Sequence, residues 1–242
     1  KEFNALQNRL EKVDTTNWPI YYQVDWWIVR AEMNGYDFNH RVLRPWVRDP
    51  AFYQTIWMYQ SDVPAHEGPT NHGVLEFWMF DFPLNNDRAK DLADQLKTIP
   101  NFLFQAKGNL TGNARDLWVA GIENFKEQAD NLEAIRKKVK KHHGKSLDGL
   151  LSAPLKNAKE ANDDFIKWLE QKAPTKNGPS GIGKENYTWY QKNVHLVPLS
   201  WEEEVSLLQR ELDRSWSSLK MEEHLNRNLP PMISAKTEQE FD

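Results

Sequence analysis

The stretch Gly178-Pro-Ser-Gly-Ile-Gly-Lys-Glu185 comes closest to a known chemical motif in this sequence. In the phosphate-binding loop G-x-x-x-x-G-K-[ST], backbone N–H groups surround the phosphates, the lysine binds the terminal phosphates and the hydroxyl binds Mg²⁺. The glycines and Lys184 fit, but Glu185 would set a carboxylate against the phosphates. The preceding residues, 164–173, have helical rather than strand spacing. We therefore interpret the stretch as a loop followed by a helix that opens at Gly183, and we expect no nucleotide binding.

The seven histidines are the next candidates, because imidazole is a common zinc ligand. They are His40, His66, His72, His142, His143, His195 and His224. No two of them stand four residues apart with a glutamate after the first, as the H-E-x-x-H motif requires. The nearest approach, His66-Glu-Gly-Pro-Thr-Asn-His72, has the wrong spacing, and its Gly-Pro pair interrupts any helix that would bring both rings to one face. We interpret it as a polar surface loop rather than a weak metal site.

Carboxylates and hydroxyls offer no catalytic constellation. Asp163-Asp164 and Glu202-Glu203-Glu204 could serve as acid and base, but the helical pattern predicts that both groups face solvent. Ser180 lacks the G-x-S-x-G spacing of a nucleophile elbow. Cysteine is absent, which excludes disulfides and thiolate chemistry. The sequence therefore predicts a chain without catalytic residues of its own.

Length, charge and hydropathy bound the remaining functions. The 242 residues allow one large domain or two small ones, and the formal net charge of −4 does not favour nucleic acid as a partner. No apolar run reaches the roughly 18 residues of a membrane span, so we expect a soluble chain. The chain begins at Lys1 rather than at methionine. Removal of an export leader, as in a periplasmic protein, or of a tag would account for this, and the compartment stays open.

The apolar residues between 122 and 139 recur in steps of three and four. This spacing predicts a long amphipathic helix from Thr111 to Gly144. Its last turns hold a basic run, where cations complement the carbonyl end of the helix dipole: Lys137, Lys138, Lys140 and Lys141. The run could attract phosphate or acidic lipid, but the pattern favours a solvated helix end.

Three more helices are predicted after it. The first has Ser152 as its cap, Pro154 in its first turn and Pro174 at its end. The second runs from Gly183 towards His195. The third opens with the capping box Ser200-Trp-Glu-Glu203. Its apolar positions, which we expect to face the core, are Val205, Leu208, Leu212 and Leu219.

The first half of the chain is less regular, with four shorter helical segments: Lys1–Val13, Trp18–Gly35, one that starts at Asp49-Pro-Ala-Phe52, and a short one over Asn85–Leu96. The fold class is therefore mainly α, with little or no sheet. We expect one helical half-domain over residues 1–242. Its parts are an irregular helical subregion (1–110), a long-helix subregion (111–228) and a tail or truncated continuation (229–242).

Aromatic residues are abundant, with eleven tryptophans in the chain. The clusters Tyr21-Tyr-Gln-Val-Asp-Trp-Trp27 and Phe77-Trp-Met-Phe80 could stack on sugars or other flat ligands. Trp26, Val29 and Met33 fall at helical spacing, however. We therefore interpret these aromatic residues mainly as core.

Several of these segments resemble the family catalogued as domain of unknown function 885. The closest similarity lies in Gly183-Lys-Glu-Asn-Tyr187 and His195-Leu-Val-Pro-Leu-Ser-Trp-Glu-Glu203. Similar segments upstream are Ile99-Pro-Asn-Phe-Leu-Phe-Gln-Ala-Lys-Gly-Asn-Leu110, the long helix after it, and Trp168-Leu-Glu170. The resemblance runs along most of the chain, but only through motifs of the family's N-terminal half.

Members of that family are similar to zinc metallopeptidases of the H-E-x-x-H type, with a mostly helical body and the metal helix in the C-terminal half. The resemblance implies that this chain is the N-terminal half of a gluzincin-like fold, forming the wall and lid of a channel for a peptide substrate. Zinc would then be bound by a C-terminal part of the same protein, expected beyond Leu229-Pro-Pro-Met232. By itself the chain would not be catalytic.

Tyr187 is the one side chain for which the resemblance implies a role. Its helix would lie near the channel, where the phenol would bind substrate; packing of the ring against the neighbouring helix is the other interpretation. A self-sufficient helical binding module without catalysis is the alternative function for the whole chain.

We expect this chain to bind no stoichiometric zinc, because its scattered histidines do not supply three or four convergent ligands. Elemental analysis of protein purified without chelator should find far less than one zinc per chain. One tightly bound zinc that is lost in a His66→Ala/His72→Ala variant would contradict this expectation.

Overall fold

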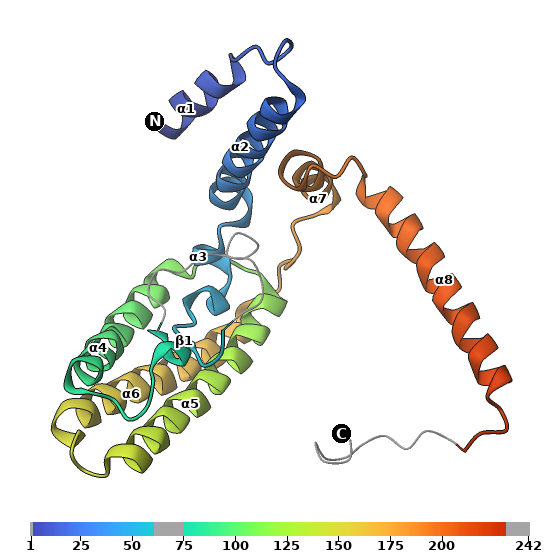
Figure 1. Cartoon of the computed structure of the whole chain (residues 1–242). Helices are drawn as coiled ribbons and strands as arrows, with labels where there is room; N and C mark the ends of the chain where they lie inside the picture. Colours follow the sequence, from blue (N-terminus) through green and yellow to red (C-terminus); the bar gives the residue numbers. More distant parts are fainter. Residues whose placement is uncertain (1, 61–74, 231–242) are drawn as a thin grey trace. The chain divides into compact units, whose positions relative to one another are not determined.

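A computed structural model describes residues 2–60 and 75–230 of the chain (Figure 1). Most of these residues are helical. The α-helices are α1 (Glu2–Glu11), α2 (Ile20–Phe38), α3 (Pro45–Arg48), α4 (Asn86–Asn109), α5 (Arg115–His143), α6 (Asp148–Lys172), α7 (Lys184–Tyr190) and α8 (Trp201–Leu225). Shorter turns are the π-helical η1 (Asn39–Leu43) and η5 (Gln191–His195) and the 3₁₀ turns η2 (Pro50–Tyr53), η3 (Phe77–Met79) and η4 (Ala173–Thr175).

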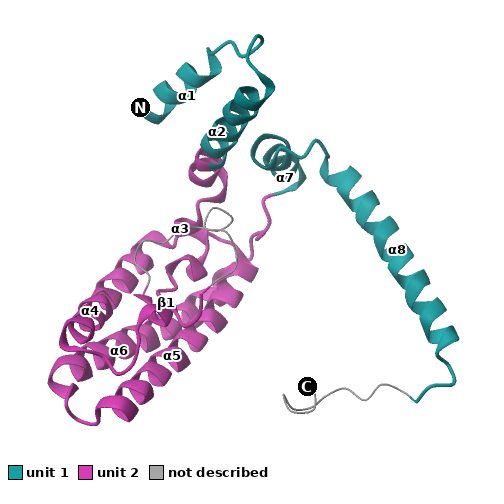
Figure 2. Cartoon of the chain, in the orientation of Figure 1, with its two compact units in different colours: residues 1–35, 183–242 teal, residues 36–182 magenta. Residues whose placement is uncertain are grey.

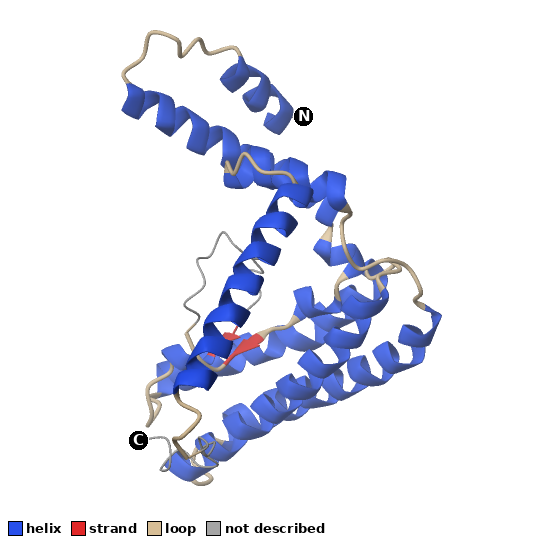
Figure 3. Ribbon diagram, turned by 90° about the vertical axis from the view of Figure 1, so that its right-hand side faces the viewer, coloured by secondary structure: helices blue, strands red, loops and turns tan. Residues whose placement is uncertain are grey.

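Sheet is confined, in the described ranges, to two strands of two residues each. β1 (Ile56–Trp57) pairs in parallel with β2 (Leu75–Glu76), as Figure 3 shows in red. The expectation of a mainly α chain is thereby confirmed. No helix within the described residues is both long and apolar enough to cross a membrane.

The chain divides into two compact units (Figure 2). Unit 1 comprises residues 1–35 and 183–242, and unit 2 comprises residues 36–182. In the sequence, unit 2 is thus inserted into unit 1. The boundary predicted at residues 110 and 111 falls inside unit 2, in the connection between α4 and α5. That the chain is half of a larger domain stays a prediction.

Unit 2 is built around α6, which packs against both α4 and α5 (Figures 1 and 3). Each of the three helices buries one apolar stripe. Where α5 meets α6, the rings of Phe125 and Phe165 lie edge to face with centroids 4.6 Å apart. Burial of each large side chain contributes about 1.5–3 kcal/mol. The long helix predicted over residues 111–144 is α5, and its apolar stripe is the buried one.

The helix predicted to be short, over Asn85–Leu96, is in fact α4, which continues to Asn109. Asn85 caps it, because its Oδ1 accepts a hydrogen bond of 2.8 Å from the backbone of Arg88. Pro100 lies inside the helix and removes one backbone hydrogen bond, at a cost of about 3 kcal/mol. The next turns are nevertheless helical, since they bury apolar side chains against α6. Packing outweighs the local preference here.

The start of α6 also differs from the prediction. The helix begins at Asp148, so Pro154 lies in its interior and Ser152 is not the cap. Leu151 and Leu155, on either side of the proline, are both buried. As in α4, burial of the flanking apolar residues compensates for the missing backbone hydrogen bond.

The helix expected to start at Asp49 is a single 3₁₀ turn, η2. The Oδ1 atom of Asp49 accepts a hydrogen bond of 2.9 Å from the backbone of Ala51, as a cap does. After Tyr53 the chain turns to the extended β1 segment instead of continuing the helix.

A buried amide pair fixes this extended segment to the helices. The Oε1 atom of Gln128, on α5, accepts hydrogen bonds from the backbone N–H groups of Thr55 (2.7 Å) and Ile56 (3.2 Å). Its Nε2 donates to Oδ1 of Asn162 on α6 at 2.9 Å, and Nδ2 of Asn162 donates to the carbonyl of Phe125 at 2.9 Å. Both amide side chains are fully buried. One polar relay therefore joins the β1 segment, α5 and α6.

In unit 1, hydrogen bonds link three segments that are distant in sequence. The Nε2 atom of Gln7 donates to Oδ1 of the buried Asn34 at 3.4 Å. The Nδ2 atom of Asn34 donates to the carbonyl of Asn193 at 3.0 Å. Asn34 therefore ties α1 to α2 and both to η5.

The first aromatic cluster is not core in the described part of the chain, contrary to our interpretation. Val29 is 49% exposed, and Tyr21 and Trp27 are also exposed. Trp26 is partly buried, and its Nε1 donates to the carbonyl of Leu10 at 3.1 Å. On the face that the helical spacing predicts, Trp26 and Met33 are partly buried and Val29 is exposed, so the described residues cover this face only in part. In the second cluster the outcome is divided, because Phe77 and Phe80 are buried whereas Trp78 and Met79 are exposed.

Helix α8 begins as predicted and packs differently. The Oγ atom of Ser200 accepts a hydrogen bond from the backbone of Glu203, and Oε2 of Glu203 accepts one from the backbone of Ser200, which completes the capping box. The expectation that its apolar positions face a core is wrong for the described residues, since α8 buries none of its residues. The exposed positions are Val205, Leu208, Leu212 and Leu219.

We expect Gln128→Ala to lower the free energy of unfolding by about 2–4 kcal/mol, because it leaves buried backbone N–H groups without acceptors and opens a cavity. Urea denaturation measures the change. The matched control is Gln105→Ala, at an exposed position of α4, which should change it by no more than about 0.5 kcal/mol. Equal effects of the two substitutions would contradict the role of the relay.

Candidate functional site around Tyr187

Tyr187 lies on α7, which continues into the π-helical turn η5. The helix predicted from Gly183 towards His195 is therefore confirmed in position. Gly183 precedes α7 with a φ of 83°, a conformation that side chains with a Cβ rarely adopt. A glycine is thus required where the family-like motif begins.

The hydroxyl of Tyr187 donates a hydrogen bond of 2.5 Å to Oε2 of Glu204, on the first turn of α8. Next to it, Oγ1 of Thr188 accepts a hydrogen bond of 3.0 Å from the backbone N–H of Trp201. These two contacts join α7 to the start of α8. The hydroxyl of Tyr187 therefore contacts the neighbouring helix. Packing of the ring against that helix and substrate binding by the phenol both stay predictions.

Lys184, the first residue of α7, makes two more contacts between α7 and α8. Its Nζ lies 3.7 Å from the centre of the Trp201 ring, a cation–π contact. The same atom lies 3.6 Å from a carboxylate oxygen of Glu202. We call Lys184, Tyr187, Thr188, Trp201 and Glu204 the α7–α8 joint.

Glu202, Glu203 and Glu204, which were considered as a catalytic acid and base, each have a separate structural role. Glu202 pairs with Lys184, Glu203 completes the capping box and Glu204 accepts from Tyr187. The acidic run is visible in the sequence, but the hydrogen bond between Tyr187 and Glu204 is not. The available signal was a tyrosine in the short helix that precedes the acidic first turn of α8. The other acidic pair, Asp163 and Asp164, forms ion pairs with Lys159 and Lys107.

The hydrogen bond to Glu204 raises the pKa of Tyr187 above its usual value of 10.0, and burial adds to this effect. The backbone and side chain of Ser200 lower the pKa of Glu203 below its usual value. The phenol therefore keeps its proton at neutral pH and acts as a hydrogen-bond donor. Any group that recruits this donor must compete with the Glu204 carboxylate.

The loop from Gly178 to Ile182 has a structural role. It follows α6 and η4, so the segment before it is helical, as predicted. The Oγ atom of Ser180 accepts a hydrogen bond of 2.8 Å from the backbone of Asp116, in the first turn of α5. Ala114, at the N-cap of α5, offers no side-chain acceptor, so Ser180 supplies the cap from a distant segment. Arg48 binds the carbonyl of Ser180 at 2.5 Å and holds the loop in place.

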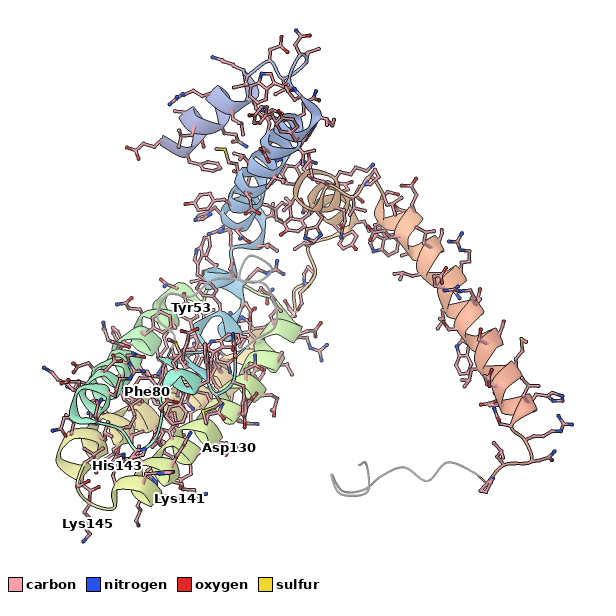
Figure 4. The ribbon with its side chains drawn as sticks, viewed as in Figure 1. Tyr53, Phe80, Asp130, Lys141, His143 and Lys145 are labelled. Atoms are coloured by element: carbon pink, nitrogen blue, oxygen red, sulfur yellow. The ribbon has the colours of Figure 1, made fainter. Side chains whose placement is uncertain are left out.

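Metal ligands are not gathered in the part of the chain that the structure describes. No group of three or more histidine, aspartate or glutamate side chains there could hold a metal ion. The His66 to His72 segment lies outside the described residues. His143, labelled in Figure 4, accepts at its Nε2 atom a hydrogen bond of 2.8 Å from the backbone of Leu84. The described residues therefore do not fit a zinc centre, and zinc in a further part of the protein stays a prediction.

We expect Glu204→Gln to lower the pKa of Tyr187 towards 10, because the amide removes the negative charge that opposes loss of the phenolic proton. Absorbance titration at the phenolate band, with Tyr187→Phe subtracted, measures this pKa. Since the folded chain holds the proton more tightly than the unfolded one, the contact stabilises the fold below pH ~10 and is lost as the pH rises through the raised pKa. The matched control is Glu202→Gln, which should leave the titration unchanged; an equal shift in this control would contradict the assignment to Glu204.

Comparisons of the chain with models of protein families, with curated proteins and with solved structures find no match. The segments around Tyr187 and the capping box therefore remain the basis of the family resemblance.

Proposed function

We propose that this chain is the N-terminal helical part of a metallopeptidase-like hydrolase, in which it forms the wall of a channel for peptide substrates. The zinc site and its catalytic residues are then supplied by a further, C-terminal part of the same protein. The single observation that supports this proposal best is the exposed apolar stripe of α8. The segments that precede and open α8 resemble the family. This resemblance implies that the partner of the stripe is a C-terminal part of the same protein.

The α8 stripe consists of residues on one face of the helix, in steps of three and four: Val205, Leu208, Leu212, Trp216 and Leu219. All are between 41% and 68% exposed. Apolar residues on a solvated helix are ordinarily scattered, whereas a continuous stripe is typical of a helix that packs against a partner. Since no described element covers the stripe, its partner is sought outside the described residues.

The α7–α8 joint supports the choice of that partner. The segments that resemble the family, 183–187 and 195–203, are the segments that build this joint. They fix the direction in which α8 leaves α7, through Tyr187, Thr188 and the Ser200 cap. A family motif that positions a helix with an unpartnered apolar stripe is consistent with a fold that continues beyond that helix.

The side chains of the α7–α8 joint are consistent with the wall of a substrate channel rather than with a catalytic centre. Lys184 is paired with Glu202, and the hydroxyl of Tyr187 donates to Glu204, so that Tyr187 would reach a substrate only by exchanging this acceptor. Such a donor can position the carbonyl of a peptide, since backbone carbonyls accept hydrogen bonds. Tyr187 is therefore our candidate for substrate contact in the assembled enzyme.

We expect the isolated chain to self-associate or to bind the dye 1-anilinonaphthalene-8-sulfonate, because the α8 stripe exposes contiguous apolar surface. Leu208→Ser/Leu212→Ser should reduce dye fluorescence severalfold. The matched control is Gln209→Ser/Asp213→Ser, which removes a hydrogen-bonded pair from the polar side of the same helix and should leave the fluorescence unchanged. Fluorescence titration and size-exclusion chromatography with light scattering provide the two readouts.

Co-expression with the segment that follows Asp242 in the gene should give a stable complex with metal-dependent peptidase activity. Leu208→Ser/Leu212→Ser should weaken that complex, whereas the polar control should not. A monodisperse, dye-silent monomer with a sharp unfolding transition, from a reading frame that ends at Asp242, would replace this proposal by the non-catalytic binding module.

A further inference from the structure

A groove runs along unit 2 where the second half of α5 meets the first half of α6, next to the turn that joins them. Its volume is about 410 Å³, within the range of small-molecule sites. The lining residues come from both helices and the turn: Leu132, Glu133, Arg136, Val139, Lys140, Gly144, Lys145, Asp148, Leu151, Ser152, Leu155, Lys156 and Lys159. Figure 4 labels Lys145 at the turn and Lys141 on the last turn of α5.

The floor of the groove is apolar and fixed. Leu132 and Val139 of α5 and Leu151 and Leu155 of α6 are all buried. They belong to the stripes by which the two helices pack, so the groove has the rigidity of the core beneath it. A bound molecule would meet a preformed surface.

The rim of the groove is basic. It carries five cationic side chains, Arg136, Lys140, Lys145, Lys156 and Lys159, against two carboxylates, Glu133 and Asp148. The chain as a whole carries a net charge of −4. The positive charge of the groove is therefore a local concentration, which opposes the charge of the whole molecule.

Two of the rim cations are available to a ligand. Lys140 and Lys145 are exposed and form no ion pair with any described residue. By contrast, Arg136 makes two hydrogen bonds of 2.7 and 2.6 Å to the carboxylate of Glu133. Lys159 pairs with Asp163 at 2.5 Å, outside the groove.

The pKa of Glu133 is lowered by the cations around it. The hydrogen bonds from Arg136 lower the pKa of this carboxyl below its usual value, and the charges of Arg136, Lys137 and Lys159 add to the effect. Lys159 belongs to α6 and Glu133 to α5, so charges from both sides act on one carboxylate. An external anion in the groove would meet two of these cations, Arg136 and Lys159, which line it.

We propose that this groove binds a phosphate-bearing anion of small-molecule size. Several cations converge on the groove, which favours a ligand with more than one negative charge. A phosphate group carries close to two charges at neutral pH and offers three acceptor oxygens. Lys140 and Lys145 bind it directly, and Arg136 joins them when Glu133 is displaced.

The two sources of such a phosphate are a free phosphorylated compound and the headgroup of an acidic lipid. The sequence already indicated this chemistry in the lysine run of α5, where a solvated helix end was the simpler interpretation. What the structure adds is the contribution of Lys145, Lys156 and Lys159 and the concave floor. The inference is independent of the proposed peptidase function, because it concerns unit 2 and the stripe of α8 belongs to unit 1.

Isothermal titration of the full chain with inorganic pyrophosphate tests the site. We expect saturable binding with one site per chain, weakened by added salt. Lys140→Ala and Lys145→Ala should each weaken binding about tenfold, the loss expected for one charge-assisted hydrogen bond. Both lysines are exposed, so the variants should fold normally, which circular dichroism checks.

Two further variants separate a built site from a general attraction to basic charge. Lys141→Ala removes the same charge from the same helix end at a residue that does not line the groove, and it should change the affinity less than twofold. Glu133→Gln should strengthen binding severalfold, because it frees Arg136 and removes a competing carboxylate. Equal losses for Lys141→Ala and Lys145→Ala would overturn the proposal.

Sedimentation with vesicles distinguishes the two sources. Binding to phosphatidylcholine vesicles that contain phosphatidic acid, competed by pyrophosphate and lost in Lys145→Ala, identifies a lipid headgroup. Binding of pyrophosphate without binding to these vesicles identifies a free compound. Binding of neither, with all variants folded, refutes the site.

Discussion

The buried amide pair Gln128–Asn162 is the constraint on which unit 2 depends. Apolar side chains tolerate small shifts of one helix against another, whereas hydrogen bonds lose strength rapidly when their geometry changes. The amides satisfy each other, two backbone N–H groups and a carbonyl only at one rotation of α5 against α6. That rotation also decides which residues of the two helices line the groove. The relay and the groove therefore depend on the same packing of α5 against α6.

Periodicity in the sequence predicts α5 well, because an amphipathic helix needs only local spacing to be identified. The prolines predict helix ends less well. Local rules would end a helix before Pro100 and begin one near Pro154, but both prolines lie inside helices. In each case the compensation comes from burial against another helix, which is not a local property. Gln128 could have been noticed as the single polar position between Phe125 and Leu132 on an apolar stripe, but its partners could not.

Spacing identifies the faces of helices, and it does not identify what covers them. The stripe of α8 and the aromatic face of α2 were both expected to be core. Among the described residues the first is exposed, and the second is only partly buried. The same limit applies to the candidate sites. Tyr187 could be singled out from its motif, while its bond to Glu204 depends on the angle at which two helices meet. The lysines of α5 were visible as a run, but Lys156 and Lys159 join them only through the register of α6.

The hydrogen bond between Arg48 and the carbonyl of Ser180 matters for the insertion of unit 2 into unit 1. Unit 2 is inserted between the two segments of unit 1, and such insertions are accommodated when the ends of the inserted unit lie close together. Arg48, near the beginning of unit 2, donates a hydrogen bond to the carbonyl of Ser180, near the end of unit 2. In the same terminal segment, Lys176 donates a hydrogen bond of 2.7 Å to the carbonyl of Gly112, in the connection between α4 and α5. Because a side chain near one end of unit 2 holds the backbone near its other end, the chain leaves this unit next to a segment close to where it entered, and the insertion closes on itself.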